Sequence, residues 1–158
     1  MARQKKSAEE LAKEDELTNS MGLFNVAEAY RLSAAALVRA EVRIGHADTP
    51  IRFLCYHAVE LYLKALLRQA QGVQAIREEF GHKTLKLLAE AERLGLPVDD
   101  EDRQIFQLMG DTDAVIESRY IVTGPKTWPT VEGLGRTCLS LRNGVGGLLR
   151  KAGVMVRL

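Results

Sequence analysis

The sequence contains few of the residues that build disulfide frameworks, rigid loops or aromatic binding surfaces. Two cysteines, four prolines and one tryptophan occur in 158 residues, and aromatic side chains make up 6%. Cys55 and Cys138 lie far apart within apolar helical patterns, so we expect two buried thiols rather than a disulfide or metal ligands. There is no Cys-x-x-Cys motif, and we expect neither a bound metal nor a cofactor.

Long apolar runs are also lacking. No stretch approaches the ~18 consecutive apolar residues of a membrane span, so we expect no membrane among the partners. The N-terminus is charged and no apolar run follows it, so we expect no signal peptide and a cytoplasmic location.

Neither sign of charge dominates, because the net charge is +1. The distribution is nevertheless uneven. Residues 119–158 hold seven basic residues and one acid, whereas residues 82–118 hold nine acids and four basic residues. The two segments could neutralise each other, within the chain or across an oligomer. Alternatively, the basic end could contact phosphate groups.

What the sequence has in abundance is helix-forming residues in helical spacing. Alanine, leucine, glutamate, arginine and lysine are frequent, and apolar residues recur three or four positions apart. We therefore predict an all-α fold, an up-and-down bundle of four to five helices. The helices are expected over residues 23–44, 50–70, 82–94, 99–120 and 130–149, with a connector at 73–80 that has room for a helical turn. Only residues 154–158 could form a strand.

The domain organisation follows from this pattern. Residues 21–158 are long enough to form one domain with a real core. Residues 1–20 are rich in lysine and glutamate and are expected to be a charged N-terminal arm, either loose or docked as a helix on a partner.

Several helix ends can be predicted from local chemistry. Thr49 is a candidate N-cap, with Pro50 at the first helical position. The four acids of residues 99–102 suit the positive end of a helix dipole better than a metal site, because consecutive side chains point in different directions. Glycines at 144, 146 and 147 either break the last helix or let another segment approach it closely.

The helix expected over residues 50–70 is apolar all round, so other helices must cover it. It carries one polar stripe. At 100° per residue, and with His57 at zero, Glu60, Lys64 and Arg68 fall at about 300°, 340° and 20°. Glu60 and Lys64 have the spacing of an ion pair. The stripe either closes the edge of the core or lines a polar cleft in which His57 exchanges a proton and a cation holds an anion.

Further candidate residues lie later in the chain. His82 follows Gly81 at a helix start, where backbone N–H groups attract anions. Arg119 and Tyr120 are placed at the end of the fourth helix, where an arginine also suits the negative end of the dipole. Each of these side chains could equally be an ordinary surface residue.

Three motifs resemble those of HEPN domains, the higher eukaryote and prokaryote nucleotide-binding domains. Residues 53–67 (FLCYHAVELYLKALL) resemble the helix with the "A-V-E-x-x-L-K-A" core, and residues 81–88 (GHKTLKLL) resemble the "G-H-x-L-x-x-L" segment. Arg119–Tyr120 resembles the "R-Y" that often closes the following helix. The order and spacing agree over residues 24–120, and the resemblance implies a helical bundle that is often a homodimer.

The resemblance also implies a possible activity, since the family includes metal-independent RNases of toxin–antitoxin and defence systems. These use an arginine and a histidine four to six residues apart at a dimer cleft, usually late in the domain. The arginine of that motif is usually followed by a polar residue. Here Arg142–Asn143 has this opening pair, but no histidine follows it. Arg52 and His57 have the spacing, but they lie on the second helix, and the apolar Phe53 follows the arginine.

Three interpretations follow. The first is a non-catalytic HEPN-like module that dimerises and binds a nucleotide, an RNA or a partner protein. Its candidate ligand-binding residues are Glu60, Lys64, His82, Arg119 and Tyr120. The second is a metal-independent endoribonuclease of the toxin or defence type, with Arg52 and His57 as catalytic residues and an antitoxin-type protein as a possible partner. Five residues apart on a regular helix, they point about 140° apart, so that site needs two subunits or an irregular helix start. The third is a structural protein in which the stripe only fixes helix packing.

Overall fold

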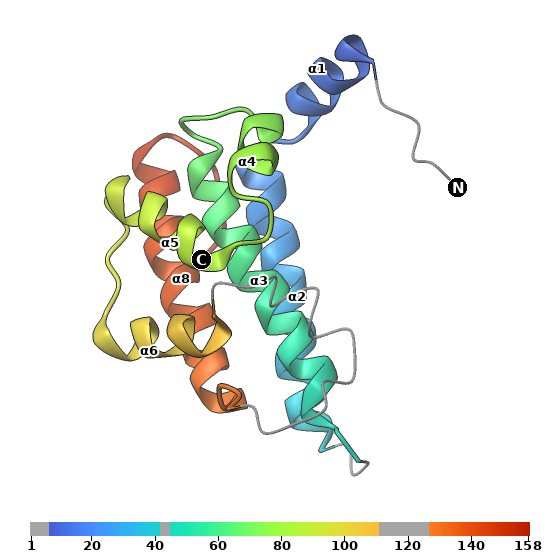
Figure 1. Cartoon of the computed structure of the whole chain (residues 1–158), viewed down its shortest axis with the longest axis vertical. Coiled ribbons are helices and arrows are strands. Elements are labelled where there is room, and N and C mark those ends of the chain that lie inside the picture. The colour runs from blue at the N-terminus through green and yellow to red at the C-terminus, as the bar shows by residue number, and fades with distance from the viewer. Residues whose placement is uncertain (1–6, 42–44, 111–126) are drawn as a thin grey trace.

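The all-α prediction is confirmed. The computed structural model describes residues 7–41, 45–110 and 127–158, and this part of the chain holds seven helices and no strand. The helices are α1 (Ala8–Leu17), α2 (Ser20–Ala40), α3 (Asp48–Leu67), α4 (Val73–Glu79), α5 (Thr84–Arg93), α6 (Asp100–Met109) and α8 (Val131–Lys151) (Figure 1). None of these described helices is long and apolar enough to cross a membrane.

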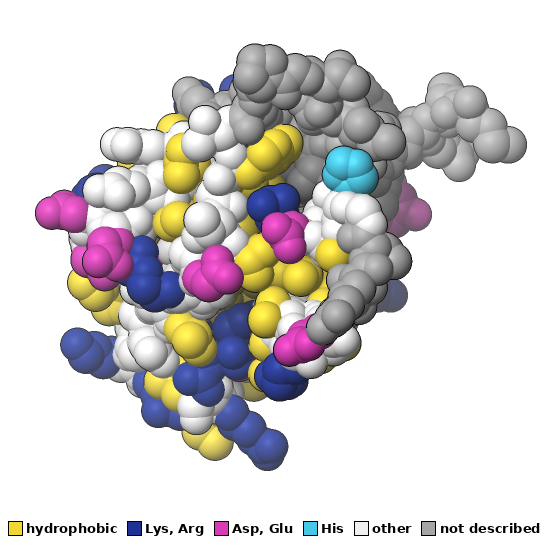
Figure 2. Space-filling model, turned by 90° about the horizontal axis from the view of Figure 1, so that it is seen from below, with side chains coloured by type: hydrophobic (Ala, Val, Ile, Leu, Met, Phe, Trp, Pro, Cys, Tyr) yellow, Lys and Arg dark blue, Asp and Glu magenta, His cyan; other side chains and the backbone are white. Residues whose placement is uncertain are grey.

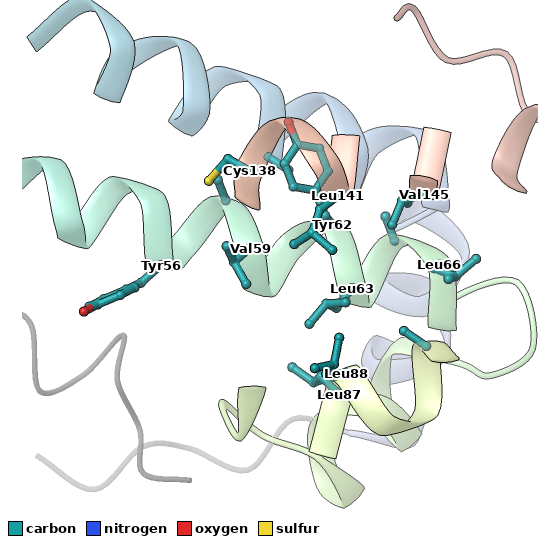
Figure 3. Close-up of a cluster of buried hydrophobic side chains, with 14 of the residues drawn as sticks. Tyr56, Val59, Tyr62, Leu63, Leu66, Leu87, Leu88, Cys138, Leu141 and Val145 are labelled. Atoms are coloured by element: carbon teal, nitrogen blue, oxygen red, sulfur yellow. The ribbon is translucent and has the colours of Figure 1, made fainter. Parts of the chain in front are cut away.

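Helix α3 lies at the centre of the bundle, as its composition predicts. Eleven of its twenty residues are buried, and α2, α5 and α8 pack against it. Tyr62 and Leu63 are fully enclosed. In Figure 3, Leu141 of α8 and Leu87 of α5 lie on opposite sides of α3. Since each fully buried large apolar side chain stabilises the fold by about 1.5–3 kcal/mol, these contacts carry much of the core.

The beginnings of the two long N-terminal helices differ from the sequence prediction. Helix α2 begins three residues early, at Ser20, because the Asn19 side chain accepts a hydrogen bond from the Gly22 N–H at 2.8 Å. Helix α3 begins at Asp48, so the prediction of Thr49 as N-cap is wrong. The Thr49 N–H instead donates to the His46 carbonyl at 3.0 Å. Pro50 still falls in the first turn, where its missing N–H removes no helical hydrogen bond.

The middle of the chain follows the prediction with shorter helices. The connector at residues 73–80 forms a seven-residue helix, α4, and α5 begins at Thr84. Asp99 caps α6 by accepting from the Asp102 N–H at 2.7 Å, which confirms the capping role of the acidic cluster. Helix α6 ends at Met109, where Gly110 adopts a φ of 79°. The predicted continuation to Arg119 and Tyr120 lies outside the described residues.

Helix α8 runs without interruption through its glycines, so they do not break the helix, and two of the three predicted positions, Gly144 and Gly146, allow close approach. A Cβ added at Gly144 would lie 2.9 Å from Leu96 Cδ1. At Gly146 it would overlap the Leu158 side chain and lie 3.2 Å from Cζ of the buried Phe24. Gly144 and Gly146 therefore lie so close to neighbouring segments that a larger side chain would need those segments to shift.

The N-terminal segment contains a helix that is attached at one end to the chain's own bundle. Figure 1 shows α1 projecting beside α4. The Asp15 carboxylate accepts a hydrogen bond from the Val73 N–H at the start of α4. The Arg68 guanidinium donates to the carbonyls of Thr18 at 2.9 Å and Asp15 at 3.0 Å. These bonds hold the end of α1 against the ends of α3 and α4.

The outward face of α2 is uncharged. Every exposed residue of α2 between Met21 and Ala36 is apolar, small or a neutral polar residue. Val26 is 47% exposed and Leu32 is 52% exposed. The only two charged residues in that stretch, Glu28 and Arg31, are largely buried. An apolar helix face of this kind is typical of a surface that meets another molecule.

Candidate functional site

The polar stripe of α3 meets the start of α5 at one buried carboxylate. Glu60 is 2% exposed. Its Oε1 lies 2.6 Å from Lys64 Nζ, one turn along the same helix. His82, just before α5, places Nδ1 3.0 Å from Oε1 and 3.1 Å from Oε2. The structure therefore brings together three residues of the predicted binding set, and we call them the Glu60 cluster.

In the Glu60 cluster, the side chains of Lys64 and His82 are more accessible to other molecules than the carboxylate is. Lys64 is 16% exposed and His82 is 39% exposed at the side chain, whereas that of Glu60 is 3% exposed. With Nδ1 donating to the carboxylate, a neutral His82 ring carries a lone pair on Nε2. Lys64 retains two further N–H donors. The cluster could thus offer one proton acceptor and one cation to an anionic ligand.

A small cavity adjoins Lys64. It has a volume of about 170 Å³ and lies between the start of α2, the outer side of α3 and α4, with Leu23, Leu61 and Ile76 among its walls. Pockets for nucleotide-sized ligands usually measure about 300–1,000 Å³. This cavity is therefore too small for a whole nucleotide.

Arg68, the last member of the stripe, has a structural role. It has three carbonyl partners. Those of Asp15 and Thr18 lie at the end of α1 and just after it, and that of Gln71 lies between α3 and α4. An arginine that donates to three carbonyls holds backbone segments together and has little capacity left for a phosphate. The stripe is therefore divided between a candidate site and the attachment of α1.

His57 lies among aromatic rings. Its ring centroid is 4.7 Å from that of Tyr30 on α2 and 5.1 Å from that of Phe53, one turn earlier on α3. The 72° angle between the His57 and Phe53 rings is an edge-to-face arrangement, which stabilises such pairs. The ring thus contributes to the packing of α2 on α3.

Arg52 lies elsewhere on α3. Its Nε donates to the Pro129 carbonyl at 3.3 Å, and a terminal nitrogen lies 3.3 Å from Asp48 Oδ2. It lines a cavity of about 420 Å³ whose lining includes the acids Glu41 and Glu132. Since α3 is a continuous helix, Arg52 and His57 point about 140° apart and do not converge within one chain.

A second charged cluster, which the sequence analysis missed, joins three helices. Glu28 of α2 accepts from Arg31 at 2.8 and 2.9 Å, from Arg142 of α8 at 3.1 Å, and from the Tyr62 hydroxyl of α3. The side chains of Glu28 and Arg142 are 17% and 21% exposed. One sequence signal could have revealed this cluster: Glu28 and Arg31 are the only charges on an otherwise neutral stretch of α2.

The surroundings of Glu28 strongly favour its ionised form. Burial raises the pKa of Glu28, but the hydrogen bonds from Arg31, Tyr62 and Arg142 outweigh burial and lower the pKa from 4.5 to about 2. Burial, followed by the hydrogen bond to Glu28, raises the pKa of the Tyr62 hydroxyl. The cluster is therefore an ion network at neutral pH in which one carboxylate, Glu28, is shared by two guanidiniums, those of Arg31 and Arg142.

The acidic and basic segments partly neutralise each other. Arg136 of α8 lies 3.0 Å from Glu101, 3.4 Å from Asp102 and 3.5 Å from Asp99 at the start of α6. Figure 2 shows acidic and basic side chains interspersed with apolar ones on one face of the molecule. Among the described residues no group of three or more histidine, cysteine or acidic side chains could hold a metal ion. Arg119 and Tyr120 lie outside the described residues.

Comparison with known proteins gives one result. The model of the HEPN domain family matches residues 50–137, more than half of the chain. This range contains α3, α4, α5 and α6 and reaches the first third of α8, so the Glu60 cluster lies inside it and Arg142 outside it. No curated protein and no solved structure matches the chain.

Proposed function

Because the chain belongs to the HEPN domain family, a family of helical nucleotide-binding and RNase-type modules, we propose that it is a non-catalytic member of that family. It forms a homodimer and binds a nucleotide, an RNA or a partner protein. Its ligand-binding residues are those of the Glu60 cluster, together with Arg119 and Tyr120.

The state of Arg142 is the observation that carries this proposal. The family's RNases place an arginine and a histidine four to six residues apart late in the domain. Arg142–Asn143 has the residue types that open that motif, but the Arg142 guanidinium lies 3.1 Å from Glu28, and residues 146–149 are Gly-Gly-Leu-Leu. An arginine held by a largely buried carboxylate is less free to contact a phosphate, and without a histidine no side chain there transfers a proton near neutral pH.

The endoribonuclease remains the alternative, because Arg52 and His57 keep the five-residue spacing. A site built from them needs Arg52 of one subunit to face His57 of the other. Metal-free cleavage of a single-stranded RNA by wild-type protein and by the His57→Ala variant tests this alternative. Under the proposal, both give the same background level. A wild-type rate that falls by tenfold or more in His57→Ala would establish the nuclease and overturn the proposal.

Binding is tested by thermal unfolding in the presence of adenine and guanine nucleotides and of a short single-stranded RNA. A ligand at 100 times its dissociation constant adds about 2.7 kcal/mol to the free energy of unfolding. The Lys64→Met variant removes one of the two cations that line the 170 Å³ cavity, the other being Arg77, and is expected to lose much of that stabilisation. The matched control is Lys13→Met, on the projecting α1. No shift with any of these probes would contradict binding of nucleotides and RNA and leave a partner protein as the ligand.

A further inference from the structure

The only two cysteines of the chain, 83 residues apart, meet in the fold. Cys55 of α3 and Cys138 of α8 are 3% and 0% exposed. The Cys138 thiol donates to the Cys55 carbonyl oxygen at 3.7 Å, so the Cys138 sulfur packs directly against Cys55. The expectation that both are buried free thiols is correct, but their separation in sequence concealed this contact.

A groove leads to both thiols. Cys55 and Cys138 line a groove of about 310 Å³ between α2 and α8 whose walls include Ala34, Val38 and Leu139. These walls are mostly apolar, so the groove admits a small uncharged molecule more readily than an ion. Hydrogen peroxide is such a molecule.

We propose that Cys55 and Cys138 form a peroxide-reactive dithiol that oxidises to an intramolecular disulfide between α3 and α8. This proposal is independent of the nucleotide-, RNA- or protein-binding function, because it uses neither the Glu60 cluster nor Arg142.

The chemistry assigns different roles to the two thiols. Cys55 loses its proton and its thiolate attacks one oxygen of the peroxide, which gives a sulfenic acid and, after protonation, one water. The Cys138 sulfur then attacks the sulfenic sulfur, the S–S bond forms, and the departing hydroxide takes up the Cys138 proton to leave as the second water. Two thiols and one hydrogen peroxide thus yield one disulfide and two waters.

The environment supports this order. The hydrogen bond from Cys138 lowers the pKa of the Cys55 thiol, against the opposing effect of burial. The hydrogen bond with Cys55 and burial both raise the pKa of Cys138 well above its usual value. The thiolate is the nucleophile, so Cys55 reacts with peroxide first and Cys138 resolves the sulfenic acid.

The test is peptide mapping of the folded protein after peroxide treatment. The protein is alkylated in denaturant without reductant and digested with trypsin, which releases residues 53–64 with Cys55 and residues 137–142 with Cys138. We expect these two peptides to be linked, at a mass two hydrogen atoms below their sum. The linked pair should vanish on reduction with dithiothreitol and be absent from the Cys55→Ser and Cys138→Ser variants.

The same variants test the order of reaction. Cys138→Ser should accumulate a sulfenic acid at Cys55 that dimedone captures, whereas Cys55→Ser should be labelled at least tenfold more slowly. Circular dichroism checks that each variant is folded. Full alkylation of both cysteines in the peroxide-treated, folded wild-type protein would overturn the proposal. So would a disulfide that links two chains, seen at twice the mass on a non-reducing gel.

Discussion

The Glu28 carboxylate binds side chains from three helices, so its ionisation contributes to the stability of the fold. Its pKa is about 2 in the folded protein, against an ordinary value of 4.5 for a glutamate. Its contribution to the free energy of unfolding is therefore present above pH 4.5 and is lost as the pH falls toward 2. A shift of this size corresponds to about 3 kcal/mol. We therefore predict that Glu28→Gln is less stable than wild type at pH 7 by up to about 3 kcal/mol, and that the gap narrows between pH 4.5 and pH 2.

Urea unfolding across this pH range measures the gap. Glu79→Gln, a change at an exposed residue of α4, is the matched control and should stay parallel to the wild type. A stability gap for Glu28→Gln that does not change with pH would show that the ion network contributes nothing through the ionisation of Glu28.

Glu60 is a second buried carboxylate, and its removal leaves the charge of Lys64 without its partner. Glu60→Leu should cost about 3 kcal/mol, because it leaves Lys64 largely buried without its partner. The double variant Glu60→Leu/Lys64→Met should recover part of that loss, since both charges are then gone. Chemical denaturation of the two single variants and the double variant measures the coupling. Strictly additive losses would mean that the 2.6 Å contact is energetically neutral.

At the scale of a helix, two glycines of α8 make opposite predictions. Gly147 has open space around it, so Gly147→Ala should stabilise the protein by up to about 1 kcal/mol through helix propensity. Gly146→Ala meets Leu158 and Phe24, and strain should cancel or reverse the same gain. Thermal unfolding of the two variants compares them directly. Equal stabilisation would show that the segment around Leu158 does not pack on α8.

The attachment of α1 depends on a few bonds at one end of the helix. Asp15→Ala removes the acceptor of the Val73 N–H but leaves the helical sequence of α1 intact. We predict faster amide hydrogen exchange at Val73 and throughout Ala8–Leu17, with little change in the exchange of α3. Glu16→Ala, on the exposed side of α1, is the control. Unchanged exchange in α1 would mean that Arg68 alone holds it.

At the scale of the whole molecule, the outward face of α2 is the candidate dimer surface. Leu32→Glu places a charge in the middle of that face and should shift the protein toward the monomer in sedimentation experiments. Leu108→Glu, an exposed leucine of α6, is the matched control and should leave the mass unchanged. A wild-type protein that is monomeric at every concentration would contradict the homodimer.

The sequence predicted structural features that depend on residues close together along the chain. The apolar composition of residues 50–70 identified the central helix, and spacing identified the Glu60–Lys64 pair. It could not predict the bond between Arg142 and Glu28, because partners 114 residues apart leave no local pattern. The contact between Cys55 and Cys138 escaped for the same reason. Thr49 was misplaced as an N-cap because the backbone had already entered the helix at Asp48.

The neutral face of α2 also bears on how assembly would respond to its surroundings. Dissolved salt screens attractions between exposed charges, most strongly beyond about 8 Å at physiological ionic strength, but it hardly affects contacts between uncharged groups. A dimer held by residues between Met21 and Ala36 has no exposed charge to screen there. Its dissociation constant should therefore stay nearly constant as ionic strength rises, whereas the binding of a nucleotide or RNA beside Lys64 should weaken steeply. Ionic strength would thus separate self-association from ligand binding in one and the same protein.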